Sequence, residues 1–304
     1  SLVSARCSVR QGWAQKGRPT ATTRIGSAQV YREPLQRLWT MGGVYSSLVF
    51  LPPRASYPST APWLHMVKGK NVEGQEIPVL LLTHGHVPER ESLADNVAEK
   101  TLLYCHGNAE DIGQNVQLYE ELSSNLGCNV VAYDYAGYGL NSLQTPSESA
   151  CYSDVEAVAD WVLGVLKTAP ANLFVLGKSL GSGSAVHCVQ TLEQSGRKPG
   201  GLIIQSGIAS AVSVVNRKLA RVMVVGDMFR NYKKLPSIGT KALLVHGIED
   251  EVVPFGNGEI NSIACKNLVK KVDLQCGHND MEYLHLHTLL EEYASFINGG
   301  TAHL

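Results

Sequence analysis

The sequence contains a serine whose neighbours suit a nucleophile. Ser179 lies in Gly-Lys-Ser-Leu-Gly, at the end of the apolar run 173–176. A chain that turns sharply from a strand into a helix needs glycine two residues to either side of the serine at the crest. A Cβ at either flanking position would collide with neighbouring backbone. The pattern predicts that Ser179 is a nucleophile, although glycine and serine are common enough in this chain to produce it by chance.

A serine nucleophile needs a base that takes its proton and a carboxylate that orients the base. Asp250 follows the apolar run 242–245, and His278 follows the next run, 268–274. Alone, a loop aspartate more often caps a turn, and a loop histidine is more often solvated. The order Ser179, Asp250, His278, each after a successive strand, is that of an α/β-hydrolase triad. Their joint occurrence favours catalysis.

Such a mechanism also needs amide donors for the oxyanion of the tetrahedral intermediate. One is expected to be the backbone N–H of Leu180, the residue after the nucleophile. The other is expected to be that of Asn108, in the loop after the apolar run 101–105. Asp111 is expected to cap the helix that follows this loop. Both roles are compatible, because the oxyanion hole uses backbone and the cap uses a side chain.

Two other kinds of site are disfavoured. Residues 177–179 read Gly-Lys-Ser, but a phosphate-binding loop would need glycine at position 172, which is Asn172. His106, His246 and His278 lack the helical spacing of zinc ligands. We therefore expect no metal, and hydrolysis through a serine requires no cofactor.

The candidate residues must be positioned by alternating strands and helices. Near-continuous apolar runs separated by amphipathic stretches indicate an α/β-hydrolase fold: a mostly parallel central sheet, helices on both faces and a minimal cap. Antiparallel edge strands are expected at 45–50 and 63–67. The strand-like runs are 78–82, 101–105, 129–133, 173–176, 202–204, 242–245 and 268–274.

Composition limits the class of protein. The chain has 304 residues, of which 44% are hydrophobic, with a formal net charge of -1. This balance gives no overall attraction for nucleic acid. The seven cysteines are scattered and form no C-x-x-C pair, which favours a reducing, cytoplasmic location over a disulfide framework. No apolar run reaches the roughly 18 residues of a transmembrane segment.

Residues 1–40 are expected to form a basic, flexible tail before a hydrolase domain at 41–304. The tail holds seven Arg or Lys residues and one acid, Glu33. Three interpretations stay open: an organellar transit peptide, a disordered tail, or a peripheral membrane anchor in which Cys7 carries an acyl chain.

Several stretches taken together resemble one family. They are YCHGNAEDIGQ, CNVVAYDYAGYG, GKSLGSG, HGIEDEVVPF and GHND, within residues 48–297. In this order they resemble the Bem46-like α/β-hydrolases, and within them the alpha/beta-hydrolase-domain-containing protein 17 subfamily, whose members are protein S-depalmitoylases. The resemblance implies a triad of Ser179, Asp250 and His278 and oxyanion amides of Asn108 and Leu180. Asp134 is interpreted as structural.

Three features depart from that family. Lys178 occupies a position that more often holds an uncharged polar residue, residues 86–100 look like an insertion, and the tail offers only Cys7 where the subfamily has a cysteine cluster. The last departure weakens the expectation of a membrane-bound substrate.

The leading hypothesis is a serine hydrolase that cleaves acyl esters or thioesters through an acyl-enzyme. Its substrate would be an acylated protein, as in palmitoyl-protein thioesterases, or a small acyl ester or thioester. The alternatives are a carboxylesterase or serine peptidase on the same fold, or a binding protein that has lost turnover. Substrate choice is assigned to the segment 207–241. Its apolar residues either receive an acyl chain or pack a short helix onto the sheet; they are Val222, Met223, Val224, Val225, Met228 and Phe229.

Overall fold

The computed structural model describes residues 49–70, 72–89, 93, 97–214 and 227–299. The tail 1–40 and the apolar residues 222–225 lie outside these ranges. So does most of the edge strand expected at 45–50. The two described residues of that range do not form a strand, so the expectation is wrong for them. The carbonyl of Val49 accepts a hydrogen bond from the Asn108 side chain, and Phe50 packs against Phe229.

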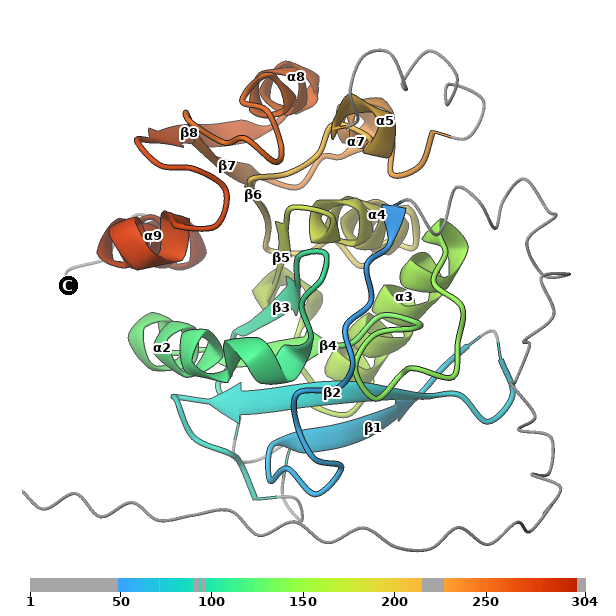
Figure 1. Cartoon of the computed structure of the whole chain (residues 1–304). Coiled ribbons are helices and arrows are strands. Elements are labelled where there is room, and N and C mark those ends of the chain that lie inside the picture. The colour runs from blue at the N-terminus through green and yellow to red at the C-terminus, as the bar shows by residue number, and fades with distance from the viewer. Residues whose placement is uncertain (1–48, 71, 90–92, 94–96, 215–226, 300–304) are drawn as a thin grey trace, which may run out of the picture. The chain divides into compact units, whose positions relative to one another are not determined.

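One sheet of eight strands organises the described residues, in the order β1-β2-β4-β3-β5-β6-β7-β8 (Figure 1). β2 runs antiparallel to β1 and β4, and all other neighbouring pairs are parallel. The strands β3 to β6 are buried throughout, as expected for apolar runs covered on both faces. The bounds are β1 Leu64–Lys68, β2 Glu76–Thr83, β3 Thr101–Cys105, β4 Asn129–Tyr133, β5 Leu173–Lys178, β6 Gly201–Gln205, β7 Ala242–Gly247 and β8 Leu268–Leu274.

Helices cover both faces of this sheet. α2 packs with α9 on one face and α3 packs with α4 on the other (Figure 1). Each pair encloses its own apolar core against the strands. The predicted α/β-hydrolase architecture and the edge strand near 63–67 are thus confirmed. The helices are α2 Val116–Leu126, α3 Glu148–Gly164, α4 Gly181–Gln194, α5 Ala211–Val214, α7 Asn231–Lys234, α8 Gly256–Ala264 and α9 Met281–Asn298, with 3-10 turns η3 Ile112–Asn115, η4 Pro170–Asn172 and η6 Leu235–Ser237.

Local sequence signals set several helix ends. The side chain of Ser147 accepts a hydrogen bond from the N–H of Ala150 and so caps α3. Asp111 caps the turn η3 by accepting from the N–H of Gln114, which confirms its predicted capping role one turn earlier than α2. α2 and α9 both end at a glycine with positive φ, Gly127 and Gly299.

Between β6 and β7 the described residues contain only the short elements α5, α7 and η6. Phe229 is fully buried, packs edge-on against Phe50 and Tyr152, and lies over the helix position Gly183. Phe229 is therefore a packing residue, although it precedes α7 and is not part of a short helix on the sheet. In the insertion at 86–100, the described residues form no helix or strand beyond a bridge between His86 and Thr83.

Candidate active site

Ser179 occupies a strained turn between β5 and α4. Its φ is +53°, in the left-handed region that residues other than glycine seldom adopt. A Cβ on Gly177 would lie 2.5 Å from the Cα of Ser182. A Cβ on Gly181 would overlap the backbone of Cys105 and lie 2.5 Å from the carbonyl oxygen of His106. Both flanking glycines are thus required by close backbone approach, as the sequence predicts.

The structure brings Ser179, His278 and Asp250 into one line of hydrogen bonds. The Nδ1 of His278 lies 2.7 Å from Asp250 Oδ2, and its Nε2 lies 3.0 Å from Ser179 Oγ. Because a carboxylate only accepts, the Nδ1–H donates to it, and Nε2 of the neutral ring is left to accept from the serine hydroxyl. All three residues are at least nine-tenths buried. This is the arrangement in which a serine can lose its proton as it attacks.

Asp250 is fixed by backbone donors as well as by the histidine. Its Oδ1 accepts from the N–H groups of Val252 and Val253, at 3.0 and 2.6 Å. The other oxygen is thereby left facing His278 Nδ1. Asp250 lies directly beyond the end of β7 and His278 beyond the end of β8, the sheet edge at which Ser179 also lies. Parallel strands bring loops far apart in sequence to this common edge.

Asn108 and Leu180 line the same pocket as Ser179. Among the turn and loop hydrogen bonds between described residues, neither backbone N–H has a partner. Leu180 also precedes α4, so its amide lies at the positive end of the helix dipole. The side chain of Asn108 accepts from the N–H of Leu51 at 3.0 Å and from the hydroxyl of Tyr138 at 2.6 Å, which fixes the loop. The two amides can therefore serve an oxyanion.

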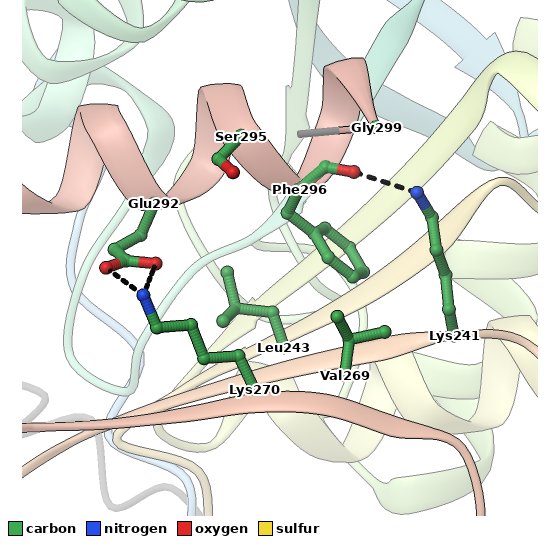
Figure 2. A pocket seen from close by; sticks show the side chains of 8 residues that line it. All are labelled: Lys241, Leu243, Val269, Lys270, Glu292, Ser295, Phe296 and Gly299. Carbon is green, nitrogen blue, oxygen red and sulfur yellow. Dashed lines mark hydrogen bonds and ion pairs between the residues drawn. The ribbon is translucent and has the colours of Figure 1, made fainter. Parts of the chain in front are cut away.

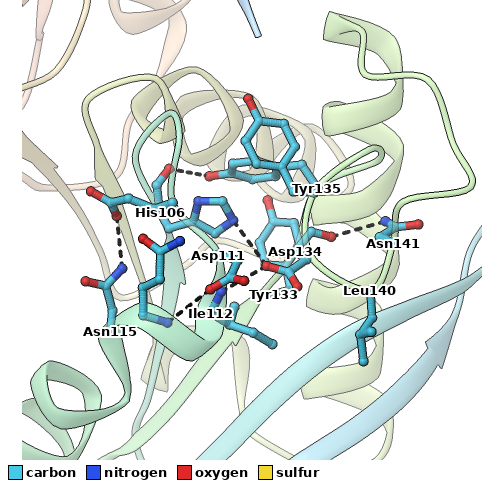
Figure 3. Close-up of polar contacts among 12 residues, drawn as sticks. His106, Asp111, Ile112, Asn115, Tyr133, Asp134, Tyr135, Leu140 and Asn141 are labelled. Carbon is cyan, nitrogen blue, oxygen red and sulfur yellow. Dashed lines mark hydrogen bonds and ion pairs between the residues drawn. The ribbon is translucent and has the colours of Figure 1, made fainter. Parts of the chain in front are cut away.

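A buried polar cluster lies next to the loop that carries Asn108 (Figure 3). Asp134 accepts hydrogen bonds from the N–H of Ile112, at 2.9 Å, and from the hydroxyl of Tyr57. His106 Nε2 lies 3.7 Å from the same carboxyl group. Burial raises the pKa of Asp134 to about 7 and lowers the pKa of His106, so both groups resist carrying charge. The interpretation of Asp134 as structural agrees with these contacts.

The pocket beside Ser179 has a volume of about 170 Å³ and a largely apolar lining. Apart from Asn108 and Ser179, its walls are Val49, Leu51, Leu180, Ile208, Ala211, Val214, Val252 and Val253.

A larger hollow of about 330 Å³ lies between α9, β7 and β8 (Figure 2). Its charged groups are already partnered: Lys270 pairs with Glu292, and Lys241 donates to the carbonyl of Phe296. Ser295 also lines it, but among the hydrogen bonds of the described residues none joins the Ser295 hydroxyl to a histidine, so size alone does not identify the site. The apolar walls beside Ser179 suit an acyl chain.

In the part of the chain that the structure describes, no three His, Cys, Asp or Glu side chains are grouped so that they could hold a metal ion. Within the same residues, none of the helices combines the length and apolar character of a membrane span.

Sequence reasoning missed several residues that hold the site together. Ser56 donates from both its N–H and its hydroxyl to Asp111, at 2.5 and 2.6 Å. Lys178 was singled out by its charge, but its two carboxylate partners, Glu110 and Glu282, were not. These contacts join segments distant in sequence, so no local spacing signals them.

Comparisons with known proteins identify related sequences. Residues 96–226 match the family model described as Serine aminopeptidase, S33. The chain is 34% identical over 190 residues to alpha/beta hydrolase domain-containing protein 17B of Homo sapiens, covering 61% of this chain and 62% of that protein. It is 32% identical over 183 residues to protein 17C of Mus musculus, covering 60% of this chain and 55% of that protein. The chain thus spans about three fifths of the length of these relatives, and its resemblance to them is confirmed.

Solved structures support the fold. The Pyrococcus furiosus esterase PF2001 superposes with a TM-score of 0.61 at 14% identity, over 83% of this chain and 98% of the esterase. Thermogutta terrifontis esterase 2 gives a TM-score of 0.60 at 17% identity, over 80% of this chain and 97% of that one. At such low identity the agreement concerns architecture alone.

Proposed function

We propose that this chain, which has the α/β-hydrolase fold and is similar to alpha/beta hydrolase domain-containing proteins 17B and 17C, is a serine hydrolase of acyl esters or thioesters. The observation that carries the proposal is the hydrogen-bonded line from Asp250 through His278 to Ser179. It ends at an apolar pocket with two available amide donors.

In the proposed reaction, His278 Nε2 takes the proton of Ser179 as Oγ attacks the substrate carbonyl carbon. Asp250 keeps the imidazole in the required tautomer and stabilises the imidazolium. The N–H groups of Asn108 and Leu180 donate to the oxyanion. His278 then protonates the leaving thiol or alcohol, and an acyl group remains on Ser179. Water, deprotonated by the same histidine, releases the acid and restores the serine.

For the leaving group and acyl chain, the similarity to the protein 17 relatives favours a palmitoyl-protein thioester, as in protein depalmitoylation. The apolar pocket supports an acyl group of some kind, since it offers few polar groups for recognition. A general carboxylesterase or a serine peptidase remains the rival, because the same three side chains act on ester, thioester and amide alike. The Serine aminopeptidase family model is the specific observation in favour of a peptidase.

Fluorophosphonate labelling tests the proposal directly. Wild-type protein is expected to label at one serine, and Ser179→Ala is expected not to label while keeping the thermal midpoint of the wild type. Palmitoyl, butyryl and acetyl thioesters, and an aminoacyl amide, compete in the same assay. Protection that is best with palmitoyl thioester supports the depalmitoylase assignment. Better protection by the butyryl or acetyl thioester replaces it with an esterase of short acyl groups, and better protection by the amide replaces it with a peptidase. If the wild-type protein does not label, the chain is a binding protein and not an enzyme.

A further inference from the structure

Lys178 is a buried cation directly before the candidate nucleophile. It is the last residue of β5, is 7% exposed, and does not line the pocket beside Ser179. Its Nζ lies 3.1 Å from Glu110 Oε1 and 2.9 Å from Glu282 Oε1. One ammonium group therefore contacts two carboxylates that come from different sides of the site. The Lys178 ammonium group takes no part in the proposed reaction.

Each of the two carboxylates also accepts hydrogen bonds from residues other than Lys178. Glu110 Oε2 accepts from the N–H of Gly107 at 3.3 Å and from the side chain of Asn115 at 3.0 Å. The carboxylate therefore braces the turn that carries Asn108. A Cβ on Gly107 would lie 3.0 Å from Glu110 Oε1, so loop and carboxylate are closely packed.

Glu282 lies in the first turn of α9, four residues after His278. Its Oε1 also accepts from the side chain of Gln205, at 2.8 Å, and Gln205 in turn accepts from the hydroxyl of Tyr293 at 2.8 Å. The start of α9 is thus tied to the end of β6. The position of the start of α9 determines where the loop before it holds His278.

The pKa shifts show that Lys178 and its carboxylate partner Glu110 stabilise each other's charged forms. Burial alone would lower the pKa of Lys178, but the two carboxylates outweigh it and the pKa is raised. Burial alone would raise the pKa of Glu110, but the ammonium outweighs it and that pKa is lowered. A buried ion pair of this kind contributes little net stability compared with apolar packing, because both partners lose water. Its value lies in fixing geometry.

We propose that Lys178 is a positioning residue, which sets the distance between the oxyanion loop and the loop of His278 through Glu110 and Glu282. This rests on the proposed hydrolase function. Turnover requires Asn108 N–H and His278 Nε2 to face the same reacting carbonyl, and an error of about 1 Å in such a placement can cost a hundredfold in rate.

Glu110→Gln and Glu282→Gln test the proposal without leaving a buried charge unpaired, since each keeps one Lys178 ion pair. In Glu110→Gln the side-chain oxygen can still accept from the N–H of Gly107, and only the strong link to the ammonium is lost. With p-nitrophenyl butyrate, each variant is expected to show a fall in kcat of about tenfold or more, with KM within about twofold of wild type. Unchanged kcat in both variants would overturn the proposal.

The triple variant Lys178→Met, Glu110→Gln, Glu282→Gln separates positioning from stability. It removes all charge from the cluster, so the thermal midpoint is expected to stay near that of wild type while kcat stays low. If the triple variant has both the thermal midpoint and the kcat of wild type, the cluster only stabilises the fold.

Lys271→Met is the matched control. Lys271 also contacts two carboxylates, Glu259 and Asp273, but it joins α8 and β8 away from the pocket beside Ser179. The kcat of Lys271→Met is expected to equal that of wild type. A fall in kcat as large as that of Glu110→Gln would count against a special role for Lys178. If wild-type protein is neither labelled nor active, the proposed function itself fails. If wild type is active and the variants match it, only the positioning role fails.

Discussion

Gly181 lies where α4 begins, packed against the carbonyl oxygens of Cys105 and His106. Gly181→Ala is expected to push the end of β3 away from Ser179, because the added methyl group meets backbone rather than a flexible side chain. We expect a loss of about 1–3 kcal/mol in the free energy of unfolding and at least a tenfold slower fluorophosphonate labelling. Urea denaturation and labelling kinetics measure the two effects.

Gly164→Ala is the control for that substitution. Gly164 closes α3, and a Cβ there would have no atom within 4 Å. Alanine at this site is expected to stabilise the protein by about 0.5–1 kcal/mol and to leave labelling unchanged. If Gly181→Ala behaves like Gly164→Ala, the close approach at the turn is not essential.

Asp250→Asn tests the orienting role of the carboxylate. One amide oxygen cannot replace both carboxylate oxygens, which accept from two backbone N–H groups and from His278 Nδ1. The imidazole is expected to turn or to take the wrong tautomer, with a fall in kcat of about a thousandfold or more. Ester hydrolysis measured with active-site titration checks this, and a variant with a tenth of wild-type activity would contradict the assignment.

His278→Ala is expected to slow turnover about as much as Ser179→Ala, because the two side chains act as a unit. In such units, losing either the serine or the histidine costs about six orders of magnitude in kcat. Retention of more than a few per cent of activity by either variant would mean that another residue acts as the nucleophile or base.

These candidate residues could be predicted from the sequence because each follows its own apolar strand. The glycine spacing around Ser179 and the order of Asp250 and His278 are local signals, and the parallel sheet gathers them at one edge. The partners of Lys178 could not be predicted in this way. Glu110 and Glu282 contact it only after β3, β5 and the start of α9 are assembled.

At the scale of elements, α3 contains a buried carboxylic acid that couples stability to pH. Asp154 accepts from the N–H of Ala136, at 2.7 Å, and from the side chain of Gln75, at 2.9 Å. Burial nevertheless raises its pKa to about 6. Between pH 4 and pH 6 the folded state keeps a proton that the unfolded state releases, so this residue's contribution to stability falls as pH rises.

Asp154→Asn is expected to remove that dependence, since the carboxamide is neutral throughout and Gln75 can turn its own amide to match. The free energy of unfolding of wild type relative to the variant should fall by roughly 2 kcal/mol from pH 4 to pH 7. Urea denaturation at several pH values provides the measurement. A difference that rises or stays flat with pH would show that Asp154 is ionised in the folded protein.

Elements with strong local patterns could be predicted, and those that depend on tertiary contacts could not. The seven strand-like runs correspond to β2 through β8. In β2 to β7 apolar residues suit a sheet covered on both faces, whereas β8 contains Lys270, Lys271 and Asp273 and is only partly buried. Phe50 reads as strand by type, but it is buried against Phe229 outside the sheet. Its surroundings, and not its propensity, decide its conformation.

At the scale of the whole molecule, the segment from Val49 to Tyr57 joins the start of the described chain to the candidate site. Leu51 contacts Asn108, and Tyr57 contacts Asp134, so this segment braces the oxyanion loop and the cluster behind it. These contacts come from residues 49–57, which a protein lacking residues 1–40 retains. A protein lacking residues 1–40 is therefore expected to label at Ser179 at a rate within about twofold of the full chain.

A protein lacking residues 1–57 provides the contrast. It loses the hydrogen bonds of Leu51 to Asn108, of Ser56 to Asp111 and of Tyr57 to Asp134, so the buried carboxyl groups of Asp111 and Asp134 each lose donors. We expect it to label at least a hundredfold more slowly and to unfold at lower temperature. Equal labelling by both shortened proteins would show that the oxyanion loop holds its geometry without this segment. Loss of labelling on removal of residues 1–40 alone would place a needed part of the catalytic domain in the basic tail.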